Sequence, residues 1–504
     1  MMQLLRTPIV LAVALALAAC AVGPKYTGAP AVDTPVAFKE GQGEWVRAAP
    51  ADLLERGPWW KLFNDPVLDG LADRVEVSNN NIAAAVASYA QARALTREQR
   101  ASLFPTVSLD GGATRSGGRG DTAERKSYQV GIGASWEPDV FGRLRRGVDS
   151  ARAGEQASQA DLASARLAAQ GELAVNYFGL READAQRAIL QATITGYQRS
   201  LQIAQNRYTA GIVARTDVLQ AQTQLANAQA DLLGVERQRA QFEHAIAVLV
   251  GQAPANFSLA AETAWQPSVP AVPVSLPSTL LQRRPDIAAA ERRVAQANEQ
   301  IGIAQAGFYP SLNLSGSAGL GAARIGDLFN ASALVWSLGA SLAQTIFDAG
   351  ATAARVERSR AALDQSAASY RQTVLSAFQD VEDQLVAARI LQQQLVLRQQ
   401  ANTSADQVEQ QVLNRYTAGQ VNYTEVISAQ ATAASARRAV LQAQVDRQTA
   451  AVALIQALGG GWTATSSNSL RAPEGPYVQT TTTSMFTKRA SALAAQPGSA
   501  GTLA

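Results

Sequence analysis

One short sequence occurs twice in this chain and constrains its fold more than any other feature. The hexapeptide NRYTAG lies at 206–211 and again at 414–419, so the two copies are 208 residues apart. Upstream of each copy, ASLFPTVSLDGGA at 101–113 aligns with AGFYPSLNLSGSA at 306–318. Matches that recur in the same order indicate two copies of one structural unit. The chain is therefore predicted to contain a tandem structural repeat.

The duplication divides the chain into parts. A Pro-rich segment, PSVPAVPVSLP at 267–277, joins the two copies, and linkers of this kind are extended and semi-rigid. Residues from about 465 onward have little apolar content and are expected to be disordered. The expected order is a signal peptide at 1–19, an N-terminal extension and equatorial segment at 20–68, a first repeat at 69–266, a linker at 267–282, a second repeat at 283–464 and the tail at 465–504.

Each repeat contains a long stretch without proline that ends at an NRYTAG sequence. These stretches run from about 144 to 207 and from about 352 to 414, and a returning helix is expected after each, to about 250 and 458. A helix of about 64 residues spans about 96 Å, which no compact core needs. Leucines interleaved with Ala and Gln are typical of helices packed side by side with one wet face. We therefore predict long antiparallel helical hairpins in a mostly α protein.

A shorter helix and two alternating segments precede each long helix. The helices are expected at about 69–100 and 285–305, and the segments, rich in Gly and Ser, are 106–109, 128–132, 312–315 and 335–342. Such alternation is the signature of membrane β-barrel strands. Four strands cannot close a barrel, because the smallest outer-membrane barrels have eight and lipid does not tolerate open edges. The chain is therefore expected to oligomerise around a small shared barrel.

Two pairs of tryptophans lie in different parts of this pattern. Trp136 and Trp336 are near the strand segments, so they either anchor the protein at the membrane interface or pack inside it. Trp59 and Trp60 lie outside the strands and are expected to pack in a core.

Composition excludes most kinds of catalytic site. The sequence holds one His and one Cys, whereas zinc sites need about three or four protein ligands and Ser or Cys nucleophiles usually need a His base. No Gly-rich phosphate loop is present. The lone His244 lies in a helical pattern and is expected to pack there. We predict that the protein is not an enzyme and needs no cofactor and no metal.

The charge pattern gives no sign of a nucleic-acid partner. The net charge is +3, and the basic residues are scattered among carboxylates along the expected helices. A nucleic-acid-binding surface would cluster them.

The first twenty residues are typical of a bacterial export signal that ends in a lipidation site. Arg6 precedes a short apolar run that is too short to span a membrane, and Leu17, Ala18, Ala19 and Cys20 fit the lipobox, whose Cys is acylated. Several acyl chains anchor a protein almost permanently. Ala21 after the cysteine fits delivery to the outer membrane. The alternative is cleavage after Ala18 with Cys20 as an unmodified thiol.

Five motifs in order resemble the outer-membrane efflux proteins of the TolC family, in its lipoprotein branch that serves drug-exporting pumps. They are VGP at 22–24, PWWKLFNDPVLDGL at 58–71, WEPDVFGRLRR at 136–146, NRYTAGIVARTDVLQAQTQL at 206–225 and RRPDIAAAERRVAQANEQIGIAQAGFYPSL at 283–312. The resemblance implies a homotrimer with a twelve-stranded outer-membrane barrel and a periplasmic α-barrel tunnel. It also implies two partners, a periplasmic adaptor (membrane fusion) protein and an inner-membrane proton-driven transporter.

The resemblance also implies roles for residues near the two turns. The tip that contacts the adaptor would consist of Arg207, Tyr208, Ala210, Gly211, Ala418 and Gly419. A periplasmic gate would be formed by Arg415, Tyr416, Asp217 and Glu425. The glycines fit tight turns at helix ends on physical grounds alone, because glycine adopts the left-handed conformation without penalty. A plain hairpin turn, and a packing and capping role for Arg415 and Tyr416, are the alternatives.

One departure from the family concerns the pore. Many relatives carry a DAQR segment after the second turn, where this chain has Ser428, Ala429, Gln430 and Ala431. In those relatives the segment narrows the pore with a ring of carboxylates. In this chain that ring is missing, or Glu425 takes its role.

Two alternative functions stay open. One is a channel with the same fold that secretes proteins or peptides, and the other is a periplasmic coiled-coil scaffold that transports nothing. The strand segments speak against the scaffold, which has no need of them.

Overall fold

The structure is a computed structural model. It describes residues 22–41, 58–117, 125–262, 265–270, 283–330 and 334–460. The expected signal peptide with Cys20, most of the linker and the tail at 465–504 lie outside these residues.

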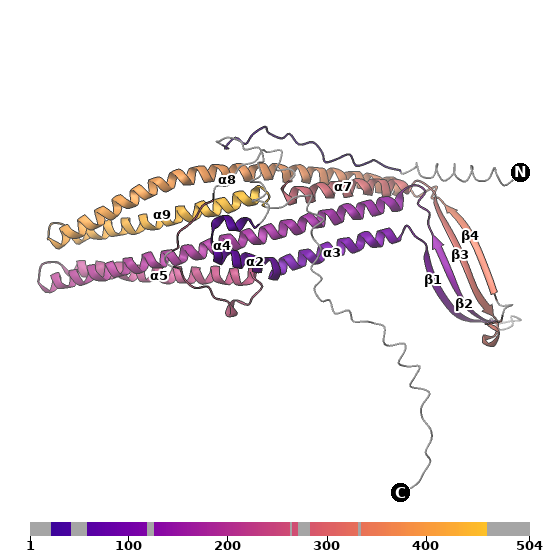
Figure 1. Cartoon of the computed structure of the whole chain (residues 1–504), viewed down its shortest axis with the longest axis horizontal. Coiled ribbons are helices and arrows are strands. Elements are labelled where there is room, and N and C mark those ends of the chain that lie inside the picture. The colour runs from indigo at the N-terminus through magenta and orange to yellow at the C-terminus, as the bar shows by residue number, and fades with distance from the viewer. Residues whose placement is uncertain are drawn as a thin grey trace, which may run out of the picture. The chain divides into compact units, whose positions relative to one another are not determined.

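The two halves of the chain share the order helix, two strands, long helix and returning helix, and the first half has one additional helix at its start (Figure 1). The first half has α2 (Pro66–Ser78), α3 (Asn80–Ala101), β1 (Thr106–Ser116), β2 (Arg125–Trp136), α4 (Arg143–Thr209) and α5 (Arg215–Leu249). The second half has α7 (Pro285–Ala306), β3 (Ser311–Ala322), β4 (Leu334–Ala343), α8 (Ala351–Thr417) and α9 (Tyr423–Ala457). Short 3-10 helices are η2 (Trp59–Phe63), η3 (Pro254–Asn256) and η4 (Ile325–Asp327).

The predicted long helical hairpins are confirmed, and the two copies match in length. Helices α4 and α8 each have 67 residues, and α5 and α9 each have 35. Each hairpin turns at a glycine with positive φ, +71° at Gly211 and +77° at Gly419. The amide of each glycine donates to the carbonyl three residues earlier, on Tyr208 and Tyr416 respectively, at 2.9 Å. The repeated sequence therefore produces the same turn twice, for the reason that the sequence predicts.

The helix expected at about 69–100 is in fact two helices, so that expectation was wrong. The chain leaves the helical conformation at Asn79, whose side chain accepts hydrogen bonds from the amides of Asn81 and Ile82. The same side chain donates to the carbonyl of Leu249 at 2.8 Å. An Asn in this position stabilises the start of a helix, so α3 begins anew after α2.

The four strands form one antiparallel sheet in the order β1-β2-β3-β4. They confirm the predicted strand segments and run 10 to 12 residues each. The middle strands approach closely where Gly131 pairs with Gly319, because a Cβ on Gly319 would lie 2.7 Å from the Cα of Gly131. All ten residues of β4 are exposed. This sheet therefore has no covering layer within the described part of the chain.

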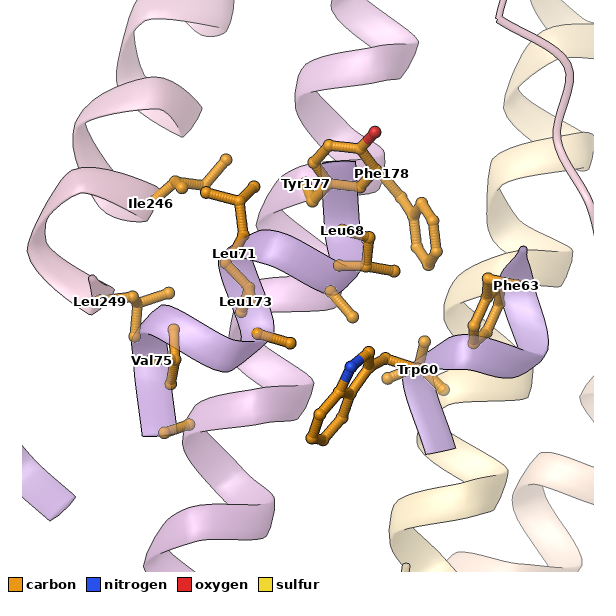
Figure 2. Packing of buried hydrophobic residues seen from close by; sticks show 14 of the residues in the cluster. Trp60, Phe63, Leu68, Leu71, Val75, Leu173, Tyr177, Phe178, Ile246 and Leu249 are labelled. Carbon is orange, nitrogen blue, oxygen red and sulfur yellow. The ribbon is translucent and has the colours of Figure 1, made fainter. Parts of the chain in front are cut away.

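A core near the middle of the helical region is made mainly by η2, α2, α4, α5 and α9 (Figure 2). Trp59 and Trp60 are 2% and 8% exposed, which confirms their predicted packing role. Leu68 and Leu71 of α2 and Leu173 and Phe178 of α4 fill the same core. Asp65 caps α2 and accepts a hydrogen bond from the hydroxyl of Tyr177 at 2.6 Å, which ties the N-terminal segment to α4.

His244 was expected to pack, and this expectation was wrong for the single chain. It is exposed on α5, although Ile246 two residues later is fully buried against the core. Residues two apart on a helix do not share a face, so the contacts that bury Ile246 do not cover His244.

Among the described helices, none is both long enough and apolar enough to cross a membrane.

Candidate functional site

The structure brings the two NRYTAG turns together. Arg207, at the end of α4, donates from Nη1 to the backbone carbonyl of Tyr416 at the end of α8. The guanidinium carbon of Arg207 also lies 4.6 Å from the centroid of the Tyr416 ring. A cation over an aromatic face is attracted to the negative face of the ring. The tips of the two hairpins are therefore joined within one chain.

A small apolar core lies behind this contact. It contains Ala204, Val218 and Ala221 of the first hairpin and Tyr416, Tyr423 and Val426 of the second. The rings of Tyr416 and Tyr423 are 5.4 Å apart between centroids, and each residue is 1% exposed. One polar contact lies farther from the turn, where Gln430 Nε2 donates to Ser200 Oγ at 3.1 Å. We call the contacts of Arg207 with Tyr416 and of Ser200 with Gln430 the tip joint.

Tyr416 and Tyr423 stay neutral over the physiological pH range. Burial raises the pKa of Tyr416, and the nearby Arg207 lowers it in part. Burial, followed by the effect of Tyr416, raises the pKa of Tyr423 to about 12. The contact of Arg207 with Tyr416 is therefore one between a cation and a neutral ring.

The four residues expected to form the gate differ in how exposed they are. Tyr416 is buried in the tip joint, whereas Arg415 and Glu425 are exposed and Asp217 is half-buried. Arg415 makes no ion pair with any other residue of the described chain segments. The backbone amide of Glu425 donates to Oδ1 of Asn422 at 3.2 Å, so that Asn422 caps α9, and Glu425 itself is exposed. The gate role of all four residues stays a prediction.

The residues expected at the adaptor-contacting tip are mostly on the surface. Tyr208 is 46% exposed, and Ala210, Gly211, Ala418 and Gly419 are all exposed. Only Arg207 is half-buried, because it packs on Tyr416. The role of this surface also stays a prediction.

A second constellation holds the N-terminal strap, residues 22–41. The buried guanidinium of Arg146 donates to three consecutive carbonyls, those of Val22 at 2.7 Å, Gly23 at 2.9 Å and Pro24 at 3.0 Å. It also pairs with Glu299 Oε2 at 2.6 Å. These carbonyls belong to the VGP motif, and Arg146 ends the WEPDVFGRLRR motif. Nothing in the sequence alone indicated that one motif binds the other.

Gly23 is required where the strap begins. Its φ is +108°, and a Cβ there would lie 2.5 Å from the Cα of Gly302 on α7. The amide of Val22 donates to the carbonyl of Phe141 at 3.1 Å, just before α4 begins. The strap therefore starts where strands and helices meet.

Further contacts fix the rest of the strap. The hydroxyl of Tyr26 donates to Glu291 Oε1 at 2.5 Å. Burial, and to a smaller extent this hydrogen bond, raises the pKa of Tyr26. The amides of Lys39 and Glu40 both donate to the carboxylate of Glu382, at 2.7 and 2.9 Å. The strap is thus held at both ends against α7 and α8.

Known proteins resemble this chain over most of its length. The model of the family "Outer membrane efflux protein" matches residues 71–252 and 276–460. The cation efflux system protein CusC of Escherichia coli O6:H1 (strain CFT073) is 30% identical over 453 residues, which cover 89% of this chain and 97% of CusC. The solvent efflux pump outer membrane protein SrpC of Pseudomonas putida is 32% identical over 464 residues, with the same coverage of 89% and 97%.

Solved structures agree with these relatives. The outer-membrane channel OprN is 31% identical, with a TM-score of 0.78, over 88% of this chain and 100% of that chain. The open state of the MtrE channel of Neisseria gonorrhoeae is 29% identical, with a TM-score of 0.79, over 88% and 99%. The structural neighbours are trimeric channels with an α-barrel tunnel and a β-barrel, so the predicted fold class is confirmed. This chain belongs to the outer membrane efflux protein family and is an outer-membrane efflux channel, not an enzyme.

Proposed function

We propose that this protein is the exit channel of a tripartite efflux pump and works as a homotrimer. The observation that carries the proposal is the four-stranded sheet. Its edge strands β1 and β4 have no further strand partner among the described residues, and β4 is exposed along its whole length. A membrane barrel needs at least eight strands and no open edge. Three copies of the sheet supply twelve strands.

The partners of the channel would be a periplasmic adaptor protein and, through it, an inner-membrane proton-driven transporter. The exposed turns around Gly211 and Gly419 offer the adaptor a surface at the end of both hairpins. Relatives of similar identity carry the names of cation, solvent and antibiotic pumps. Substrate choice therefore belongs to the transporter, and the channel conducts passively.

Acylation of Cys20 would add a lipid anchor to the channel. Cys20 precedes Val22 by two residues, and Arg146 holds the carbonyl of Val22 beside the start of α4. Helix α4 begins only a few residues after β2 ends. An acyl chain on Cys20 would therefore enter the leaflet close to the strands, without pulling on the rest of the chain.

The gate would rest on the exposed charges at the tips. Arg415 and Glu425 lie in solvent near the second turn, with Asp217 beside the first. Tyr416 would support this gate from behind, because its ring is buried. Surface ion pairs contribute at most about 1 kcal/mol each, so such a gate is weak enough for a docked partner to open.

Mass and conductance of the purified protein test the proposal together. Light scattering in detergent should give the mass of three chains, and planar lipid bilayers should show discrete conducting channels. Addition of the cognate adaptor should increase the conductance. A monomer, or a trimer that never conducts with or without adaptor, would instead favour a periplasmic scaffold and overturn the proposal.

A further inference from the structure

The two faces of the β-sheet differ in chemistry. Side chains alternate along a strand and paired residues point to the same side, so the pairing shows which residues share a face. One face carries mainly Gly, Ser, Thr, Asn and Gln. The other carries most of the large apolar side chains, among them Leu109, Ile132, Trp336 and Leu338, which are 55% to 81% exposed. We call this second face the lipid face, because a membrane barrel turns its apolar side to lipid.

The lipid face is charged at one end only. Within the four described strands its only charged residues are Arg115 of β1 and Lys126 of β2, which lie directly opposite each other. They lie at the end of the sheet away from the helices (Figure 1). Arg324 adds a third cation there, because it follows Ala322, the partner of Tyr128, by two residues in an extended conformation. All three are exposed, and we call them the basic cluster.

The length of β2 places the basic cluster at the level of lipid head groups. Lys126 and Trp136 lie at opposite ends of the lipid face of β2, about 33 Å apart along the strand. Barrel strands tilt by about 35 to 45°, so the two residues differ in height by about 25 Å, which is the height of the apolar band of such a barrel. The indole of Trp136 donates to the carbonyl of Leu103 at 3.0 Å, just after α3 ends. Lys126 therefore reaches the opposite, outer surface of the membrane.

The described parts of the chain supply no anion for two of these cations. Neither Lys126 nor Arg324 makes an ion pair with another residue of the ranges that the structure describes. Asp110 lies on the other face of the sheet, where it accepts a hydrogen bond from the hydroxyl of Ser108 at 2.8 Å. Cations at opposite positions of a strand pair repel each other, and an anion bound between them removes that repulsion. The basic cluster therefore fits an anionic ligand from outside the chain.

We propose that the basic cluster binds the phosphates of the phosphorylated glycolipid in the outer leaflet of the outer membrane. Guanidinium and ammonium groups donate charge-assisted hydrogen bonds to phosphate oxygens. Below the cluster on the same face lie Tyr128, Leu320 and Leu334, which would contact the acyl chains. The surface therefore fits a phosphate attached to a lipid better than a free phosphate. This inference rests on the proposed trimeric barrel, which turns the lipid face toward the membrane.

Binding of lipid A to the purified trimer tests the proposal. Native mass spectrometry from detergent would count the bound lipids and give their dissociation constants, with bisphosphorylated lipid A as the probe and the same lipid without its phosphates as the comparison. A cation near an anionic lipid surface strengthens attachment about fivefold. Lys126→Ala and Arg324→Ala should therefore each weaken binding of the phosphorylated lipid about fivefold, and the double variant about 25-fold. Lys126→Arg should keep the wild-type affinity.

Arg125→Ala is the matched control. Arg125 precedes Lys126 in sequence and is also exposed, but it pairs with Ser116 on the polar face of the sheet. This variant removes the same charge at the same height, so the affinity for lipid A should stay near that of wild type. If Arg125→Ala and Lys126→Ala weaken binding equally, then net charge alone attracts the lipid, and the proposed site is wrong.

The outcomes separate this inference from the proposed function. A protein that is monomeric and does not conduct in planar bilayers overturns both, because without the barrel there is no lipid face. A conducting trimer that binds lipid A equally well with and without phosphates overturns the lipid site alone. So does a conducting trimer in which the double variant keeps the wild-type affinity. Release of the lipid by millimolar inorganic phosphate would also contradict the proposal, since the cluster would then bind phosphate without regard to the lipid.

Discussion

Removal of the Arg146 side chain should release the start of the N-terminal strap. The guanidinium of Arg146 serves three carbonyls and the carboxylate of Glu299, and the two side chains are only 8% and 13% exposed. Loss of one partner from a buried ion pair costs about 3 to 5 kcal/mol, because the other charge stays buried without a partner. The strap can move away and let water reach Glu299, so the cost falls on strap docking and not on the whole fold.

The magnitude of this effect is large enough to measure directly. A loss of about 3 kcal/mol lowers the ratio of docked to released strap by roughly a hundredfold or more. Trypsin should then cleave Arg146→Ala after Lys25 far faster than wild type, and amides near Val22 should exchange faster with deuterium. The cleavage rate of Arg146→Lys should be closer to that of Arg146→Ala than to that of wild type, because the ammonium group of lysine lacks the planar fork of five donors.

Arg145→Ala is the matched control. Arg145 neighbours Arg146 in sequence, but its side chain is 44% exposed, and its partner Asp139 also accepts from the backbone amides of Leu144 and Arg145. Surface pairs contribute about 0 to 1 kcal/mol, so cleavage after Lys25 should stay near the wild-type rate. If Arg146→Ala also keeps the wild-type rate, then Tyr26 and the amides bound to Glu382 hold the strap alone, and the reasoning about Arg146 fails.

Three further predictions concern other parts of the chain. Wild type should incorporate a palmitate analogue and Cys20→Ser should not; equal labelling would exclude acylation of Cys20. Burial raises the pKa of Glu182, so the wild-type fold loses stability as the pH rises through that pKa. Glu182→Gln should therefore melt at a higher temperature than wild type at pH ~7, with the gap closing near pH ~4, and a gap that is constant with pH would contradict this. Glu425→Gln should reduce the preference of the channel for cations in bilayers under a salt gradient; an unchanged reversal potential would remove Glu425 from the pore.

The sequence determined the elements of this protein because each follows from near neighbours along the chain. Absence of proline over 139–253 and 311–472 allowed two long hairpins, and Gly211 and Gly419 set their turns. Alternation with Gly and Ser marked all four strands. Asn79 was missed as a helix break although its cap is local, because it accepts from the amides of Asn81 and Ile82. The clamp of Arg146 on the strap could not be inferred from near neighbours, because its carbonyl acceptors on the strap lie more than one hundred residues away along the chain.

Only the tertiary structure decided what each copy of the repeat does. Two identical hexapeptides give Tyr416, which is 1% exposed, and Tyr208, which is 46% exposed. Local sequence cannot distinguish these tyrosines, since the same six residues surround both. The difference arises because Arg207 of the first hairpin covers Tyr416 of the second, whereas no described part of the chain covers Tyr208 of the first. Burial at the tips is thus set by contacts between residues about two hundred positions apart, which no local pattern encodes.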